Sequence, residues 1–316
     1  MARFLLRRLA GIVATLVVTS FAVFGSVHLA PGDPASFLLG GRSASPAAIA
    51  AIRAQYHLDD PFLVQYVKWA GGVLTGDFGR SVQFRQDVAG LILARVPTTL
   101  WLVGYATVLI VIAGLALGAL AALRPGTIDR IVLTGTAVAT ATPSFVAAMA
   151  LISVFSLRLG WFPAFGNGTG FGDRIWHLTL PAAALALTFA GLLARITRAS
   201  MLEELGREHV EVSRARGLAG RAVVRRHVIR NALGPIATVI GTVVAGLLVA
   251  TSIVETAFGL AGVGQLLVGS VTVKDFPVVQ AVSLLVVLGF VTANLLVDLV
   301  LPLIDPRLSH AKGGAR

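Results

Sequence analysis

The chain has 316 residues, of which 56% are hydrophobic and only 13% are charged, and its mean hydropathy is +0.85. Because roughly a quarter of the residues in a soluble globular domain are charged, this composition excludes an ordinary soluble domain and indicates an integral membrane protein. The net charge of +11 does not indicate nucleic-acid binding, because the basic residues lie between long apolar runs, and the lack of cysteine excludes disulfides, thiol catalysis and Cys-based zinc sites.

Uncharged runs long enough to cross a bilayer predict six spans. A bilayer core takes about 20 apolar residues in a helix, and the spans are expected at about 9–30, 98–122, 131–155, 178–199, 233–255 and 277–301. The period-two alternation of a transmembrane barrel is absent. The predicted fold class is therefore an all-α integral membrane protein with six transmembrane helices. The first run could be a signal peptide, but it exceeds the roughly 7–15 apolar residues of such a segment, so we expect a span.

The segment 31–97, between the first two spans, is long enough to hold structure of its own. Ser45-Pro46 and Asp60-Pro61 are typical helix starts, and the apolar periodicity behind each predicts two short amphipathic helices. Two such helices cannot bury a core alone, so we expect them on the membrane surface or against a partner. A lid that packs on the spans and a docking surface for an external protein are both open interpretations.

Bends and polar residues within the spans are candidates for a substrate pathway. Pro143 and Pro181 should bend their helices, and freed carbonyls could line a cavity. The polar residues that could face it, or equally serve helix packing, are Thr140, Thr142, Ser144, Thr188, Thr251 and Ser252. Glu255, at the end of the fifth span, is expected to reach water or to contact a cation or gate. Asp298 is expected to make a helix-packing hydrogen bond.

The segment 195–232, between the fourth and fifth spans, predicts a helical hairpin. A helical pattern runs to Arg216, and Gly217 follows it at the position where helices commonly end in a left-handed residue. A second short helix is expected over about 221–232, ending before Pro235. Small side chains at Ser213 and Ala215 would let another protein's backbone come close.

The charges of this hairpin leave two interpretations. Its arginines could simply bind anionic headgroups and enforce orientation. The polar residues around the small patch, Glu208, Glu211, Arg214 and Arg216, favour a docking face instead, because acids are interleaved with the arginines.

The uncharged run 256–273 could be mistaken for a seventh span. Its four glycines make it a poor continuous helix, so we expect a non-spanning loop with a partly buried or re-entrant piece. With six spans, most Lys and Arg residues fall in 1–8, 123–130, 195–232 and 302–316. The positive-inside bias then predicts cytoplasmic termini, a cytoplasmic hairpin and an external 31–97 segment.

The hairpin resembles a motif of ABC-importer permeases. Glu211-Val-Ser213-x-x-x-Gly217 is similar to their Glu-Ala-Ala-x-x-x-Gly motif, although Val212 and Ser213 replace both alanines. These replacements, and the long distance from Gly217 to Pro235, resemble the dipeptide/oligopeptide/nickel branch. Stretches that match this branch in order are Arg214-Ala-Arg-Gly-Leu218, Leu29-Ala-Pro-Gly-Asp-Pro34, Gly76-Asp-Phe-Gly-Arg-Ser81, Leu159-Gly-Trp-Phe-Pro-Ala-Phe-Gly166 and Ile253-Val-Glu-Thr-Ala-Phe258.

The resemblance implies a type I importer permease. Residues 1–94 would hold the first span and the external helices, 95–302 the transmembrane core and 303–316 a cytoplasmic tail. The hairpin 201–232 would fit a groove on an ATPase through Glu208, Glu211, Ser213, Arg214, Ala215, Arg216, Gly217 and Leu218. The implied partners are a second homologous permease, two ATPase subunits and an external substrate-binding protein, besides membrane lipid. The expected cargo is a di- or oligopeptide, with nickel or another small solute as the alternative.

No catalytic or cofactor motif is present in the sequence. There is no Gly-x-x-x-x-Gly-Lys-Ser/Thr phosphate loop, no Gly-x-Ser-x-Gly and no pair of histidines at i, i+4. We therefore expect a non-catalytic subunit without a cofactor or metal, and we expect partner subunits to hold ATP and magnesium. The rivals are an integral-membrane enzyme or scaffold with a headgroup-binding basic loop, which would need polar clusters at interface depth, and a secondary transporter, which would need a mid-membrane titratable residue.

Overall fold

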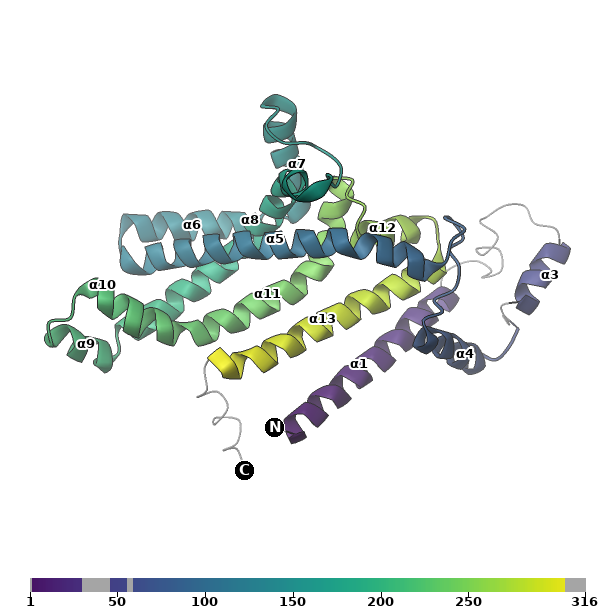
Figure 1. The fold of residues 1–316 in the computed structure, drawn as a ribbon, viewed down its shortest axis with the longest axis horizontal. Helices are drawn as coiled ribbons and strands as arrows, with labels where there is room; N and C mark the ends of the chain where they lie inside the picture. The colour runs from purple at the N-terminus through teal and green to yellow at the C-terminus, as the bar shows by residue number, and fades with distance from the viewer. Residues whose placement is uncertain (1, 30–45, 56–58, 305–316) are drawn as a thin grey trace. The chain divides into compact units, whose positions relative to one another are not determined.

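The computed structural model describes residues 2–29, 46–55 and 59–304, and Figure 1 shows them as a helical protein. Apart from one isolated β-bridge between Arg80 and Asp87, the regular structure of these residues is helical. The helices are α1 (Ala2–Leu29), α3 (Pro46–Gln55), α4 (Phe62–Thr75), α5 (Val88–Leu123), α6 (Thr127–Ala141), α7 (Ser144–Leu151), the π-helical η1 (Ile152–Arg158), α8 (Gly170–Leu205), α9 (Glu208–Ala215), α10 (Gly220–Val223), the π-helical η2 (Val224–Ile229), α11 (Arg230–Ala257), α12 (Val263–Thr272) and α13 (Phe276–Ile304).

Five helices are long and apolar enough to cross a membrane, and a sixth span is formed by a bent pair. The five are α1, α5, α8, the uninterrupted run α10–η2–α11, and α13. The sixth consists of α6 followed by α7–η1. The predicted all-α class with six spans is thereby confirmed. Two helix starts are confirmed as well: α3 begins at Pro46 and α4 directly after Pro61, whereas Ser45 lies outside the described residues.

The third span, expected at about 131–155 with a bend at Pro143, is broken into two helices at that proline. α6 and α7–η1 are bent by 100° at Thr142-Pro143. Thr142 is extended, with φ −79° and ψ 119°, because a proline disfavours helical geometry in the residue before it. Pro97 and Pro181 remain inside α5 and α8. The break therefore puts a polar Thr-Pro-Ser sequence at a corner of the transmembrane region.

The chain divides into two compact units. One comprises Met1–Thr99 with Leu260–Val291, and the other comprises Leu100–Gly259 with Thr292–Arg316. In the first unit α4 lies beside α1 (Figure 1). Their contact is aromatic: the rings of Phe21 and Phe24 pack on Tyr66 at centroid distances of 5.3 and 5.7 Å, and the Tyr66 hydroxyl is 2.8 Å from Ser20 Oγ.

The glycine-rich run after α11 does not span, as predicted. Its helix, α12, has only 10 residues, about half of what a bilayer core requires. Within the first unit, Val263 and Leu266 of α12 are buried with Val88 of α5 and Val278 of α13. The Val263 N–H also donates to Thr99 Oγ1 at 2.9 Å. α12 is therefore a packed, non-spanning helix.

The second unit is organised around α8, which packs on α6, α7 and α11. Glycines allow this close approach. A Cβ at Gly118 of α5 would lie 2.5 Å from the Ala194 carbonyl oxygen, and one at Gly191 would collide with Thr140 and with the Thr136 carbonyl of α6. Small residues at helix contacts are how membrane proteins bring backbones together. α8 therefore links the broken third span to the fifth span, and it continues into the hairpin.

Candidate functional site

The first arm of the hairpin is two helices, not the single helix predicted up to Arg216. α8 ends at Leu205 and α9 covers Glu208–Ala215. Between them Arg207 is extended, with ψ 145°, and Gly206 is a poor helix former. The Arg207 side chain pairs with two carboxylates at the end of α8, Glu203 at 2.8 Å and Glu204 at 2.9 Å. α9 is thus a separate short helix, held to the end of α8 by ion pairs.

The turn after α9 has the geometry predicted for Gly217. Its φ is +78°, in the left-handed region that favours glycine. The Gly217 N–H donates to the Arg214 carbonyl at 2.9 Å and the Leu218 N–H donates to the Ser213 carbonyl at 3.3 Å. These two bonds form the Schellman motif that closes a helix, so one glycine sets the direction of the chain between the two arms.

The second arm was predicted to end before Pro235, and this is wrong: Pro235 lies inside α11. From Gly220 to Ala257 the chain is helical without interruption, through α10, η2 and α11. The second arm and the fifth span are therefore one helix. No break in the helix therefore separates the second arm from the fifth span.

The two arms are joined by side chains that the sequence did not point to. The rings of His209 and His227 have centroids 6.3 Å apart, and Asn231 Nδ2 lies 3.4 Å from His209 Nε2. Val210 and Val228 are fully buried. The hairpin is therefore a packed unit in which α9 rests on η2 and the start of α11.

Most of the predicted coupling residues lie on the surface of this unit. The exposed ones are Glu208, Glu211, Arg214, Ala215, Arg216, Gly217 and Leu218. Ser213 is buried, and its hydroxyl donates to the His209 carbonyl at 2.7 Å. The interpretation of Ser213 as part of a small docking patch is therefore wrong: it shares a face with Val210, and that face rests on the chain itself.

The sequence patterns also did not predict an ion pair that α8 makes shortly before the hairpin. Arg198 of α8 donates to both carboxylate oxygens of Asp129 in the first turn of α6, at 2.5 and 2.6 Å. This bidentate geometry makes the pair stronger and more directional than a single hydrogen bond between the same groups. It ties the start of the third span to the helix that carries α9. The only sequence signal was an acid in the first turn of a helix, which does not identify a partner 69 residues away.

Four of the predicted pathway residues, Thr142 among them, gather near the break in the third span. Thr188 Oγ1 of α8 donates to the Thr142 carbonyl at 3.4 Å, and Val146 N–H bonds to the Pro143 carbonyl. Thr140 Oγ1 donates to the Thr136 carbonyl at 2.8 Å, and Ser144 is half-buried. A hydroxyl from a neighbouring helix thus satisfies a carbonyl at the corner, as is usual for interrupted membrane helices.

The other two pathway residues and Glu255 lie near the end of α11. Thr251 and Glu255 are fully buried and Ser252 is nearly so. The interpretation of Glu255 as a residue that reaches water is therefore wrong. α11 continues past it to Ala257, and the loop before α8 folds over this end, with the Gly166 N–H on the Phe258 carbonyl at 3.3 Å. The side chain of Asp298 lies outside the described part of the chain.

The family models and the curated relatives that match this chain all describe membrane components of transport systems. Residues 114–310 match the family model described as "Binding-protein-dependent transport system inner membrane component", and residues 1–103 match the model of its N-terminal part. Among curated proteins, the chain is 37% identical to the glutathione transport system permease protein GsiC of Salmonella paratyphi A and 38% identical to that of Escherichia coli. Each alignment covers 98% of this chain and 100% of the relative.

Solved structures share the fold at lower identity. An inward-facing MetNI methionine ABC transporter chain matches at TM-score 0.55 and 20% identity, over 68% of this chain and 96% of that one. A chain of an amino acid ABC transporter matches at TM-score 0.52 and 20% identity, over 69% and 94%. These likenesses agree with the type I importer permease fold expected from the hairpin.

Proposed function

The chain belongs to the family of binding-protein-dependent transport system inner membrane components, and on that premise we propose that it forms half of a translocation pathway for short peptides. Family membership makes it a multi-pass inner membrane permease of an ABC importer, a non-catalytic subunit that works with an ATPase and a substrate-binding protein.

The cargo assignment rests on one observation. Relatives that align over 98% of this chain are named for the transport of glutathione, which is a tripeptide. To test it, the complete importer would be purified with its partner subunits and binding protein and reconstituted in proteoliposomes. We expect saturable, ATP-dependent uptake of a labelled di- or tripeptide. Nickel uptake that excess peptide does not inhibit would contradict the proposal.

The pathway is proposed to follow two groups of polar side chains in the second unit. One group lies near the Thr142-Pro143 corner and the other near the end of α11. Their members are Thr140, Ser144, Thr188, Thr251, Ser252 and Glu255. What supports this placement is that both groups sit on helices packed against one another, α7 with α8 and α7 with α11, so one movement of α11 would act on both.

The coupling contact is proposed to be α9 with the Gly217 turn. Glu208 and Glu211 are exposed, and neither makes an ion pair within the described part of the chain, so both are available to a basic surface on an ATPase. Two ATPase subunits and a second, homologous permease would complete the importer. The ATPases would hold ATP and magnesium, and their movement would reach the fifth span through the uninterrupted helix.

We predict that the purified chain alone hydrolyses no ATP, because its sequence lacks a phosphate-binding loop. Phosphate release would be measured before and after addition of the ATPase subunits, with a catalytically inactive ATPase preparation as the control. Hydrolysis by a preparation that mass spectrometry shows to be free of other subunits would refute this prediction.

We predict cytoplasmic termini and an external 31–97 segment, because most basic residues then lie inside. The chain has no native cysteine, so single thiols can be introduced at two exposed alanines, Ala50 on α3 and Ala219 in the hairpin turn. A membrane-impermeant maleimide should label Ala50→Cys in spheroplasts and should label Ala219→Cys only after permeabilisation. The reverse pattern would overturn the topology.

A further inference from the structure

The acids of the hairpin all lie on its first arm. All four of its acids, Glu203, Glu204, Glu208 and Glu211, precede Gly217. After Gly217 no acid occurs until Glu255, and four arginines follow instead. This set, called the arginine face below, consists of Arg221, Arg225, Arg226 and Arg230. Acids and arginines are thus interleaved on the first arm only, and the second arm carries arginines without acids.

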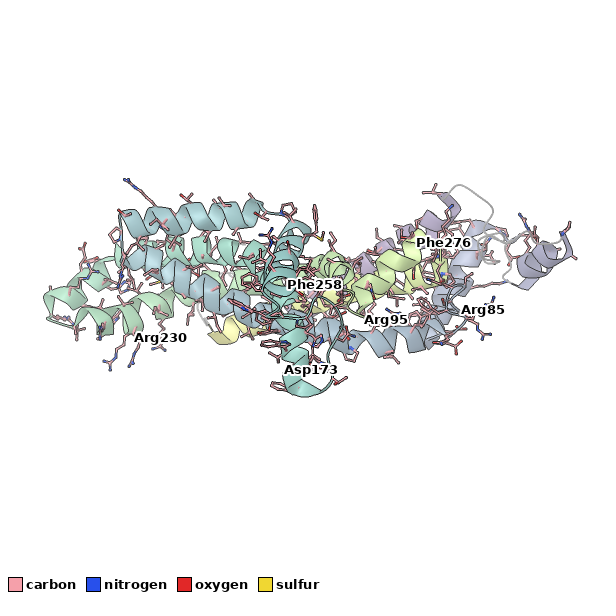
Figure 2. The ribbon with its side chains drawn as sticks, turned by 90° about the horizontal axis from the view of Figure 1, so that it is seen from above. Arg85, Arg95, Asp173, Arg230, Phe258 and Phe276 are labelled. Carbon is pink, nitrogen blue, oxygen red and sulfur yellow. The ribbon has the colours of Figure 1, made fainter. Side chains whose placement is uncertain are left out.

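The four guanidinium groups of the arginine face are exposed. None of them makes an ion pair or hydrogen bond within the described part of the chain. Figure 2 shows the Arg230 side chain directed away from the helices. By contrast, Arg198 and Arg207 on the first arm are paired with carboxylates. The arginine face is therefore a positive surface without internal compensation.

The continuous helix places this surface next to the membrane. α10, η2 and α11 form one helix, and its apolar part begins directly after Arg230 and Asn231. At a rise of 1.5 Å per residue, Arg221 lies only about 14 Å along the axis from Arg230. Two of the four arginines are within roughly a Debye length, about 8–10 Å, of the span's end. A second arm that bent away at Pro235 would not keep this proximity.

We propose that the arginine face binds anionic phospholipid headgroups of the leaflet on the hairpin side. Guanidinium groups form paired hydrogen bonds with phosphate oxygens, and clusters of four or more basic residues beside a span favour anionic lipid surfaces. In this scheme α9 contacts the ATPase and the second arm contacts the membrane. The lipid anchor steadies the helix along which movement of α9 reaches the fifth span. The assignment of α9 in this scheme rests on the proposed function; the lipid contact does not.

The test compares matched double variants in the assembled importer. Wild type, Arg225→Gln/Arg226→Gln and Arg214→Gln/Arg216→Gln would be reconstituted in phosphatidylcholine nanodiscs with spin-labelled phosphatidylglycerol or phosphatidylcholine. Electron paramagnetic resonance gives the relative association of the two lipids with the protein. We expect Arg225→Gln/Arg226→Gln to lower the preference for phosphatidylglycerol roughly five- to tenfold and to keep ATPase co-purification. We expect the Arg214/Arg216 variant, on and after α9, to keep the lipid preference.

A charge-preserving variant shows whether a loss of lipid preference comes from the lost charge or from misfolding. Arg225→Lys/Arg226→Lys should retain the lipid preference, because lysine supplies the same charge near the surface. An unchanged preference in Arg225→Gln/Arg226→Gln would overturn the proposal, and if ATPase association were lost at the same time, the occupant of the arginine face would be the ATPase. A loss of preference in the lysine variant would also overturn it. If Arg214→Gln/Arg216→Gln keeps both lipid preference and ATPase association, these two arginines take no part in the coupling contact, while the lipid contact stands.

Discussion

Gly217→Val is expected to reduce transport by roughly five- to thirtyfold while the chain still inserts at normal levels. Gly217 has φ +78°, where a side chain costs about 1–2 kcal/mol, a free energy that corresponds to this range of population ratios. A Cβ at this position would meet no atom within 4 Å, so the whole effect is on the backbone. The turn would relax by breaking its two closing hydrogen bonds, and α9 would point elsewhere relative to α10.

The measurement is peptide uptake and substrate-stimulated ATPase activity at matched membrane levels of the chain. Gly220→Val is the control, since Gly220 lies in the same turn region, has open space around its Cβ position and has no positive φ. It should leave transport close to wild type. If Gly217→Val transports as well as Gly220→Val, the hairpin turn does not set the coupling geometry.

Sequence patterns predicted those features that local chemistry decides. The left-handed turn was predictable because the backbone preference of Gly217 does not depend on distant residues. The spans were predictable because an uncharged apolar run of about 20 residues is long enough to cross a bilayer core as a helix. Prolines show the limit of prediction from local sequence, because Pro143 breaks its helix and Pro235 does not. The difference depends on what surrounds each proline, since neighbouring helices can satisfy the groups that a proline frees.

The candidate site was predictable in its position and not in its inner contacts. Seven of the eight proposed coupling residues are exposed, but Ser213 faces inward. Its spacing of three from Val210 was the available signal, because residues at i and i+3 share a helix face. The pairing of Asp129 with Arg198 and the burial of Glu255 join segments distant in sequence. Periodicity along one segment contains no information about such contacts.

Gly191→Val is expected to destabilise the second unit by forcing α6 and α8 apart. Gly191 is buried in α8 at its contact with α6, and a Cβ there would lie 2.6 Å from the Thr136 carbonyl oxygen besides colliding with the Thr140 hydroxyl. Backbone cannot move aside as a flexible side chain can, so the two helices must separate. Overpacking of this kind costs about 1–3 kcal/mol or more. In a membrane no hydrophobic driving force between helices offsets it.

The separation would reach the proposed pathway because Thr188 lies one turn before Gly191 on the same face. Its 3.4 Å hydrogen bond to the Thr142 carbonyl would be lost, and that carbonyl would be left without its partner at the corner of the third span. Thermal unfolding of the purified chain in detergent should show a clear loss of stability, graded from Gly191→Ala to Gly191→Val. Gly135→Val on α6 is the matched control, because its Cβ position has no atom within 4 Å. Equal unfolding temperatures for Gly191→Val and Gly135→Val would mean that α6 and α8 do not approach at Gly191, and the corner would then need another explanation.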